Sequence, residues 1–139
     1  MSTNSLIGKV KEDGSVEGIY CHWDGDPSYN GKILLESYKD EAKIDKLLEL
    51  RSLSSLGKEI GDKVDFDDHE AGKGQCVSHY RDRDEKDINI IKSKSVEDFR
   101  VNSNYGGTEF VYTFKDGVWT CFDQAEDKSF ELTEKSCSN

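Results

Sequence analysis

The sequence predicts an α+β fold: one antiparallel sheet built from two β-hairpins and a central strand, with helices packed on one face. Three observations support this prediction. Two pairs of strand-like segments flank Asp-Gly dipeptides at residues 13–14 and 116–117, and Asp-Gly is typical of tight hairpin turns. Apolar residues recur at helical spacing between the hairpins. Because an isolated hairpin is only marginally stable, joining both in one sheet covered by helices is the economical arrangement.

The helices are expected mainly in the first half of the chain. The first hairpin spans residues 6–11 and 16–21, and a loop with the single proline follows it. The first helix is expected over residues 29–39. The second helix begins at the capping residue Asp40, and its buried face is expected to comprise Ile44, Leu47, Leu48 and Arg51. After it, an ordered connection over residues 53–60 is expected to pack on the two helices.

The second half of the chain supplies the remaining strands. Residues 62–74 are polar and acidic and are expected to form an exposed loop. A central strand that includes His79 is expected over residues 75–80, and a short strand over residues 88–91. Ser95 is the expected cap of a short helix. The second hairpin, residues 109–114 and 118–122, places on one face Phe110, Tyr112 and Phe114.

We expect residues 1–139 to form a single domain, because a chain of this length falls in the usual size range of one domain. Residues 1–4 and a C-terminal tail, from about residue 124 to residue 139, are expected to fray. Within this tail, Phe130 and Leu132 are expected to add an edge strand, and residues 136–139 are expected to be loose.

The charge of the chain limits its partners. It carries 29 acidic against 19 basic residues, a formal net charge of −10. Such a chain repels phosphate backbones, so we expect no direct binding of nucleic acid. It is suited instead to a basic surface on another protein. The alternative is that the charge serves solubility alone.

The sequence also predicts where the chain resides. No apolar stretch approaches the roughly 20 residues that a membrane span requires, so no membrane is expected as a partner. The first residues lack the basic and apolar regions of a secretory signal. The four cysteines form no CxxC pair. We therefore expect a cytoplasmic protein with reduced thiols, of which Cys21 and Cys121 pack within strands.

The densest group of unusual residues is the loop of residues 20–32, which joins the first hairpin to the first helix. Trp23 and Tyr29 would stack a base, His22 would donate a proton, and Lys32 would pair with a phosphate at the helix start. The glycine spacing fits neither a P-loop nor a dinucleotide fingerprint. Packing and helix capping, a nucleotide site and a protein contact all remain open. The candidate binding residues of this loop are Tyr20, His22, Trp23, Asp24, Tyr29 and Lys32.

Acidic segments form a second group of candidates, a surface for a basic partner or simply solvated loops. One further such segment is residues 123–134. The acidic candidate residues are Asp65, Asp67, Asp68, Glu70, Asp82, Asp84 and Glu85.

Metal sites and catalytic signatures are not expected. Calcium loops of the EF-hand type starting at Asp24 or Asp65 lack the required glycine at the sixth position. The three histidines and four cysteines show no pair at zinc-ligand spacing. No GxSxG elbow is present, and no cysteine has a local nucleophile signature. We therefore expect no cofactor, no metal and no catalytic residue.

Residues 19–35 read IYCHWDGDPSYNGKILL. This segment resembles a group of small proteins of tailed phages and prophages that carries an IYCHWDGYP…GKILLE signature. Residues 53–57, 79–83, 110–112 and 116–119 are also similar to that group. Asp26 stands where the group usually has an aromatic residue, which weakens a stacking role for the loop. The resemblance implies a phage accessory protein made in the cytoplasm of a bacterial host, and it implies no activity.

These observations lead to a functional hypothesis. We expect a non-catalytic accessory protein that binds a host protein with a basic surface and inhibits or modulates it. The most plausible target is a nuclease-based anti-phage defence, of the CRISPR or restriction type. The alternative is a small-molecule binder that sequesters or processes a signalling nucleotide through the His22–Lys32 loop. A third hypothesis is a minor structural protein of the phage particle.

Overall fold

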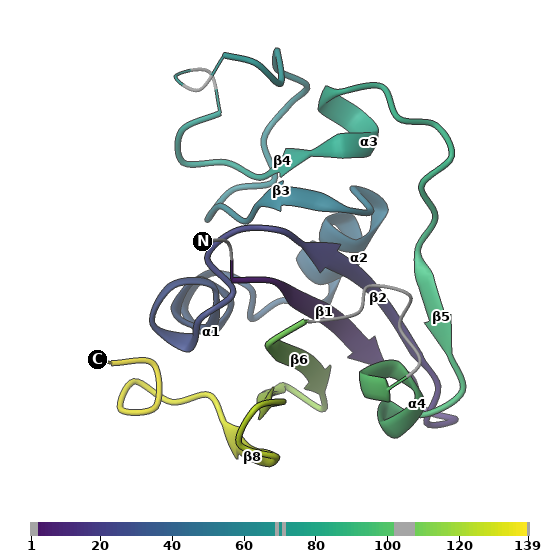
Figure 1. Ribbon diagram of the computed structural model, residues 1–139, viewed down its shortest axis with the longest axis vertical. Helices are drawn as coiled ribbons and strands as arrows, with labels where there is room; N and C mark the ends of the chain where they lie inside the picture. The colour runs from purple at the N-terminus through teal and green to yellow at the C-terminus, as the bar shows by residue number, and fades with distance from the viewer. Residues whose placement is uncertain (1–2, 69, 71, 102–107, 139) are drawn as a thin grey trace.

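The computed structural model describes residues 3–68, 70, 72–101 and 108–138. In this part the chain has an α+β fold with an eight-stranded mixed sheet and four short α-helices (Figure 1). The order along the sheet is β4-β3-β2-β1-β6-β7-β8, and β5 pairs with β2. The strands are β1 (Ser5–Val10), β2 (Val16–Cys21), β3 (Leu53–Ser55), β4 (Val77–Ser78), β5 (Ile91–Ser93), β6 (Phe110–Lys115), β7 (Val118–Asp123) and β8 (Lys128–Glu131).

Both predicted hairpins are confirmed. β1 pairs antiparallel with β2, and β6 pairs antiparallel with β7. In the second turn, Asp116 and Gly117 have φ angles of 51° and 82°. A two-residue turn with positive φ at both positions matches the right-handed twist of the flanking strands. The predicted aromatic face also holds, because Tyr112 and Phe114 are buried in the main core and Phe110 packs against it.

The prediction of a purely antiparallel sheet is wrong, because two strand pairs are parallel. β1 runs parallel to β6, which joins the two hairpins, and β2 runs parallel to β3. Parallel neighbours need a long crossover between them. Residues 22–52, which contain the first helices, supply that crossover from β2 to β3. Alternating side chains reveal that a strand is half-buried but not which way its neighbour runs.

The central strand is shorter than predicted. Only Val77 and Ser78 form β4, and α3 (His79–Asp82) begins directly after them. The Ser78 side chain accepts a hydrogen bond from the amide of Arg81 at 3.0 Å, which caps the helix. His79 therefore lies in a helix and not in the predicted strand, because this cap ends the extended conformation after two residues.

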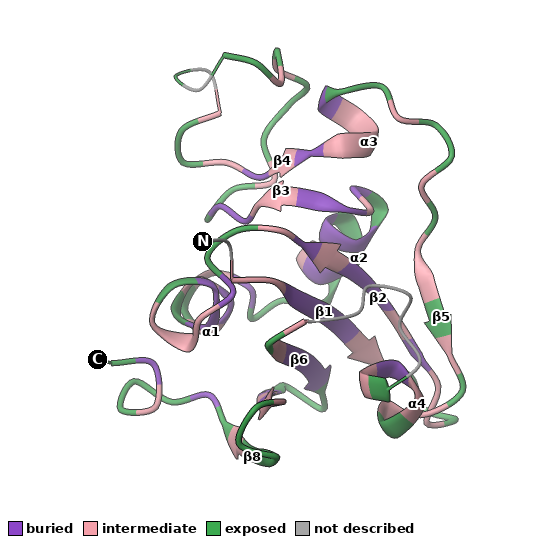
Figure 2. Cartoon of the chain, in the orientation of Figure 1, coloured by how far each residue is buried: buried purple, intermediate pink, exposed green. Residues whose placement is uncertain are grey.

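Helices cover both faces of the sheet, whereas the sequence predicted one. α1 (Lys32–Ser37) and α2 (Glu41–Glu49) contribute Leu34 and Ile44 to the core on one face. α4 (Val96–Val101) packs its Phe99 on the opposite face, in a second cluster (Figures 1 and 2). Gly8 and Gly18 are paired across β1 and β2, and a Cβ on either would come within 3.0 Å of the Phe99 ring. The paired glycines thus make the recess that holds Phe99.

The first two helices differ from the prediction at their ends. The segment predicted to start the first helix forms η1 (Pro27–Gly31), a π-helical turn, and α1 follows it. Asp40 caps α2 as predicted, since its side chain accepts a hydrogen bond from the Ala42 amide. Arg51 lies beyond the end of α2 with a φ of 62°, so it does not share the buried helix face.

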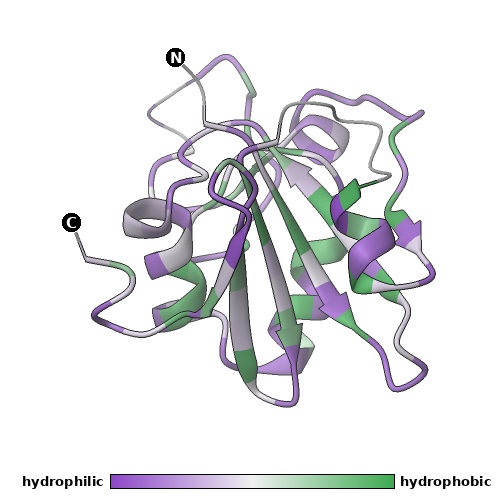
Figure 3. Cartoon of the chain, turned by 60° about the horizontal axis from the view of Figure 1, so that its bottom comes forward, coloured by the Kyte–Doolittle hydropathy of each residue, from purple (hydrophilic) through white to green (hydrophobic). Residues whose placement is uncertain are grey.

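The chain after β7 carries more structure than the sequence suggested. β8 pairs antiparallel with β7, in agreement with the predicted edge strand. Leu132 and Cys137 are both buried in the main core. Hydrophobic residues concentrate along the strands and the helices packed on them, while the loops are mainly hydrophilic (Figure 3). Among the described helices, none has the length and apolar character needed to cross a membrane.

Gly18→Ala should destabilise the fold, because its Cβ would lie 2.4 Å from the Phe99 ring and 2.7 Å from the Ile7 carbonyl oxygen. Overpacking of this kind costs about 1–3 kcal/mol. Urea unfolding should therefore show a lower midpoint for Gly18→Ala, and Gly18→Ala/Phe99→Leu should recover part of the loss. An unchanged midpoint for the single variant would show that α4 does not need this recess.

Candidate functional site

Three segments far apart in sequence meet at the end of β2. The amides of His22 and Trp23 donate to the carbonyls of Leu53 and Ser54, both at 3.0 Å. The amide of His79 donates to the carbonyl of Ser52, also at 3.0 Å. Residues 22–23, 52–54 and 79 are therefore neighbours across β2, β3 and the start of α3. The segments 19–35, 53–57 and 79–83, in which the sequence resemblance was seen, come together here.

An aromatic row lies along one face at this point, formed by Tyr20, His22 and Trp23. The Tyr20 hydroxyl is hydrogen-bonded to His22 Nδ1 at 3.0 Å. The His22 ring contacts the Trp23 ring edge to face, with centroids 4.8 Å apart and planes at 83°. Trp23 is nevertheless 45% exposed. The row thus holds a large aromatic ring in a defined position while leaving much of it open to solvent.

The loop that carries Trp23 is anchored by hydrogen bonds to buried groups. The Asn30 side chain is fully buried and donates to the Trp23 carbonyl at 3.1 Å. The Tyr112 hydroxyl donates to the Gly25 carbonyl, and the Gly25 amide donates to the Thr3 carbonyl. These bonds link the loop to β6 and to the segment before β1. The loop is therefore part of the folded core and not a free connection.

The helix start in this loop cannot receive a phosphate in the way the sequence suggested. The Asp26 carboxylate accepts from both the amide and the hydroxyl of Ser28, at 2.9 and 2.8 Å. The amides of Tyr29 and Gly31 donate to the Asp26 carbonyl, and that of Asn30 donates to the Asp24 carbonyl. The protein's own carboxylate therefore fills the place that an anion would take.

The six loop candidates do not form one cluster. The structure brings Tyr20, His22 and Trp23 together, and Asp24 follows them with an exposed side chain and a φ of 56°. Tyr29 is 58% exposed on η1, and Lys32 is exposed at the start of α1. Neither Tyr29 nor Lys32 takes part in the hydrogen bond and the ring contact that build the aromatic row.

His79 is a neighbour of the row that sequence analysis missed as a site residue. Its Nδ1 is hydrogen-bonded to the Ser52 hydroxyl at 3.0 Å, and its ring lies 5.5 Å from that of Phe66. Burial lowers the pKa of His79, and the positive charge of Arg83 lowers it further. His79 is therefore neutral at pH 7. The cap at Ser78 was the sequence signal that would have placed His79 at a helix start.

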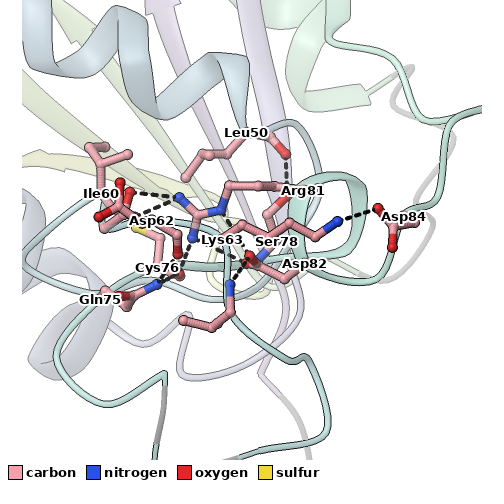
Figure 4. Close-up of polar contacts among 12 residues, drawn as sticks. Leu50, Ile60, Asp62, Lys63, Gln75, Cys76, Ser78, Arg81, Asp82 and Asp84 are labelled. Atoms are coloured by element: carbon pink, nitrogen blue, oxygen red, sulfur yellow. Dashed lines mark hydrogen bonds and ion pairs between the residues drawn. The ribbon is translucent and has the colours of Figure 1, made fainter.

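Asp82, one of the acidic candidates, is a structural residue and not a surface contact. It is 5% exposed, and it accepts hydrogen bonds from Arg81 and from the amides of Ser78 and Val64 (Figure 4). Arg81 in turn donates to the carbonyls of Ile60 and Cys76. This Arg81–Asp82 pair fastens residues 60–64 to β4 and α3. The prediction that Asp82 belongs to a binding face is therefore wrong, because its carboxylate is buried and hydrogen-bonded within the fold.

The other acidic candidates fall into two kinds. Asp84 forms an ion pair with Lys63 at 2.7 Å, and Glu85 forms one with Arg83. The remaining four are exposed on the loop before β4, where Glu70 forms an ion pair with Lys73 at 3.3 Å (Figure 2). We call this set the acidic loop: Asp65, Asp67, Asp68 and Glu70. The acids of residues 123–134 lie on the β7–β8 side, at the opposite edge of the sheet.

The four thiols are buried in this fold. Burial raises the pKa of Cys21 and that of Cys121 to about 12 each, and it also raises the pKa of Cys76 and of Cys137. The thiolate is the reactive form, so burial disfavours reaction at these cysteines. Within the described residues, no group of three His, Cys, Asp or Glu side chains is arranged to hold a metal ion.

The chain matches no protein-family model, no curated protein sequence and no solved structure.

Asp82→Asn should destabilise the chain at neutral pH. Burial alone would raise the pKa of Asp82, but the hydrogen bonds from Arg81, Ser78 and Val64 outweigh it and lower this pKa. A lowered carboxyl pKa stabilises the fold above about pH 4, and the contribution is lost as pH falls through the folded-state value.

Loss of the charged hydrogen bonds should cost about 2 kcal/mol at pH 7. Urea unfolding at several pH values should show the difference between native chain and Asp82→Asn shrinking below about pH 4. Asp67→Asn, on the exposed loop, is the matched control and should change little at either pH. An equal loss at pH 3 and pH 7 would contradict the role given to the Asp82 charge.

Proposed function

We propose that this chain acts by binding another protein, and that it modulates this partner without chemistry of its own. The observation that supports the proposal is the exposed Trp23, held in place by Tyr20 and His22. Tryptophan is among the residues that most often dominate protein interfaces. A ring already fixed in position loses little conformational entropy on binding, so more of its contact energy becomes affinity.

The charge of the surroundings supports a basic partner. Asp24 is exposed beside Trp23, and the acidic loop precedes β4. The loop contacts the same region, since Phe66 lies against His79. Complementary charge chiefly accelerates association and excludes wrong partners, while buried aromatic anchors supply affinity. The two features together describe an interface with an aromatic centre and an acidic rim.

The setting that we propose is a bacterial cell infected by a phage, as the sequence resemblance implies. A nuclease that defends the cell must grip DNA, and its DNA-binding surface is basic because affinity for DNA depends on cations. Occupying such a surface would inhibit the enzyme. We therefore propose a nuclease-based defence, of the CRISPR or restriction type, as the target.

The nucleotide alternative has less support. At the start of the first helix, the Asp26 carboxylate occupies the position where the nucleotide alternative places a phosphate. The ring contact of Trp23 is with His22 and not with Tyr29, so Trp23 and Tyr29 do not define one base-stacking slot. Binding to a protein requires neither feature.

Affinity capture from bacterial lysate tests the proposal. Because Cys137 is buried, the tag belongs at the N-terminus. The native chain should retain a defined partner in stoichiometric amount, and Trp23→Ala/Tyr29→Ala should reduce recovery at least tenfold, as loss of a dominant contact does. Val118→Ala, an exposed apolar residue on another turn, is the control. The proposal is refuted if the native chain, the double variant and Val118→Ala capture the same proteins in equal amounts.

Reversing charge in the acidic loop should slow association with the captured partner. Asp67→Lys/Glu70→Lys should lower the association rate constant by about tenfold at low salt and leave dissociation nearly unchanged. Biolayer interferometry at several salt concentrations measures both rates. Glu12→Lys/Glu97→Lys alters the net charge equally at exposed sites elsewhere. An equal effect of both double variants would mean that only net charge matters.

A further inference from the structure

We infer that Trp23 receives an arginine side chain of the partner protein, with Asp24 as the countercharge. This inference rests on the proposed function and specifies the chemistry of the partner at that site. Three observations support it: the cation contacts of the other aromatic rings, the negative charge of Asp24 next to Trp23, and the ring contact of Trp23 with His22.

The chain pairs its own cations with its aromatic rings repeatedly. Five such contacts occur among the described residues, with the cation 4.0–5.6 Å from the ring centroid. In proteins generally, significant contacts of this type occur about once per 70–80 residues. The pairs are Lys43 with Tyr38, Arg51 and Lys86 with Tyr80, Arg83 with Phe66, and Arg100 with Phe122.

Trp23 stands apart from these rings. Tryptophan is the best aromatic acceptor of a cation, yet no cation among the described residues lies over the Trp23 ring. The ring contact described for it is with His22, and 45% of the residue remains exposed. The strongest cation acceptor on the surface is therefore open to a cation from outside the chain.

The charge next to Trp23 selects a cation over a neutral ligand. Asp24 is exposed, and its positive φ of 56° is a conformation that non-glycine residues rarely adopt. The Asp26 carboxylate is hydrogen-bonded to Ser28, which leaves Asp24, the next residue after Trp23, as the exposed carboxylate of this loop. An anionic ligand, including the phosphate of a nucleotide, would be repelled here.

Arginine fits this pair better than lysine does. The guanidinium group is planar, stacks on aromatic faces and binds carboxylates through two parallel hydrogen bonds. An ammonium group is a compact and strongly hydrated point charge. A guanidinium can therefore contact the Trp23 ring and a neighbouring carboxylate together, at a smaller desolvation cost.

Peptide binding tests the inference directly. Three labelled Gly-Ser peptides differ only in three positions that are arginine, lysine or citrulline, the neutral counterpart of arginine. Fluorescence anisotropy at low salt should show the arginine peptide binding about fivefold more tightly than either of the others, the gain expected for an exposed cation–π contact with an ion pair.

Tryptophan emission supplies a second readout. Trp119 is 4% exposed and hydrogen-bonded to the Tyr38 carbonyl, so it is shielded from the peptide. The arginine peptide should change the emission of Trp23 and leave that of Trp119 unaltered in Trp23→Leu. In the binding assay, Trp23→Leu and Asp24→Asn should each remove the arginine preference, Trp23→Phe should keep part of it, and Val118→Ala should keep all of it.

The inference is overturned if lysine or citrulline peptides bind as well as the arginine peptide, or if Trp23→Leu keeps the preference. It is also overturned if choline competes with the arginine peptide at equal concentration, which would mean a site for quaternary ammonium groups. Failure here is distinct from failure of the proposed function. A partner that native chain captures and Trp23→Leu loses, together with equal binding of the arginine, lysine and citrulline peptides, would preserve the proposed function and refute the arginine contact.

Discussion

The parallel pairing of β2 with β3 is the constraint on which the functional end of this molecule depends. Two backbone hydrogen bonds, from His22 and Trp23 to Leu53 and Ser54, fix where the chain leaves the sheet. Ser52, directly before β3, is hydrogen-bonded to His79 through both backbone and side chain. Without this pairing, the aromatic row would not be held in position relative to α3.

Polar groups inside the fold are used here for positioning. The Asn30 amide, the Tyr112 hydroxyl and the Asp26 carboxylate all hold the backbone of one loop. The Arg81–Asp82 pair does the same for residues 60–64, which lead into the acidic loop. These polar groups are therefore used to hold loop backbone in position, whereas Trp23 and Asp24 remain exposed.

The features predictable from sequence are those decided by neighbouring residues. The Asp-Gly turns follow from local backbone preferences, and the caps at Asp40 and Ser95 follow from local side-chain hydrogen bonds. The direction of β6 beside β1 was not predictable, because it depends on residues a hundred positions apart. The recess for Phe99 was missed for the same reason, since it needs two glycines from different strands.

The candidate site shows the same limit. Trp23 and His22 attracted notice because of their types, but the contact of His22 with Tyr20 depends on the alternation of side chains at the end of β2. Asp82 looked like any other acid of its charged run, and only the fold shows that it is enclosed. Sequence therefore indicated the residue types of a surface and overestimated how many acids reach it.

The carboxylate of Asp26, seated in the turn before the first helix, has a kinetic consequence. A loop that waits for a ligand to complete its hydrogen bonds must order itself during each encounter, and that slows capture. In this protein the hydrogen bonds of the loop are formed without a ligand, so the loop already has its folded conformation when another molecule arrives. If a partner binds at this loop, association should not be delayed by a search among loop conformations.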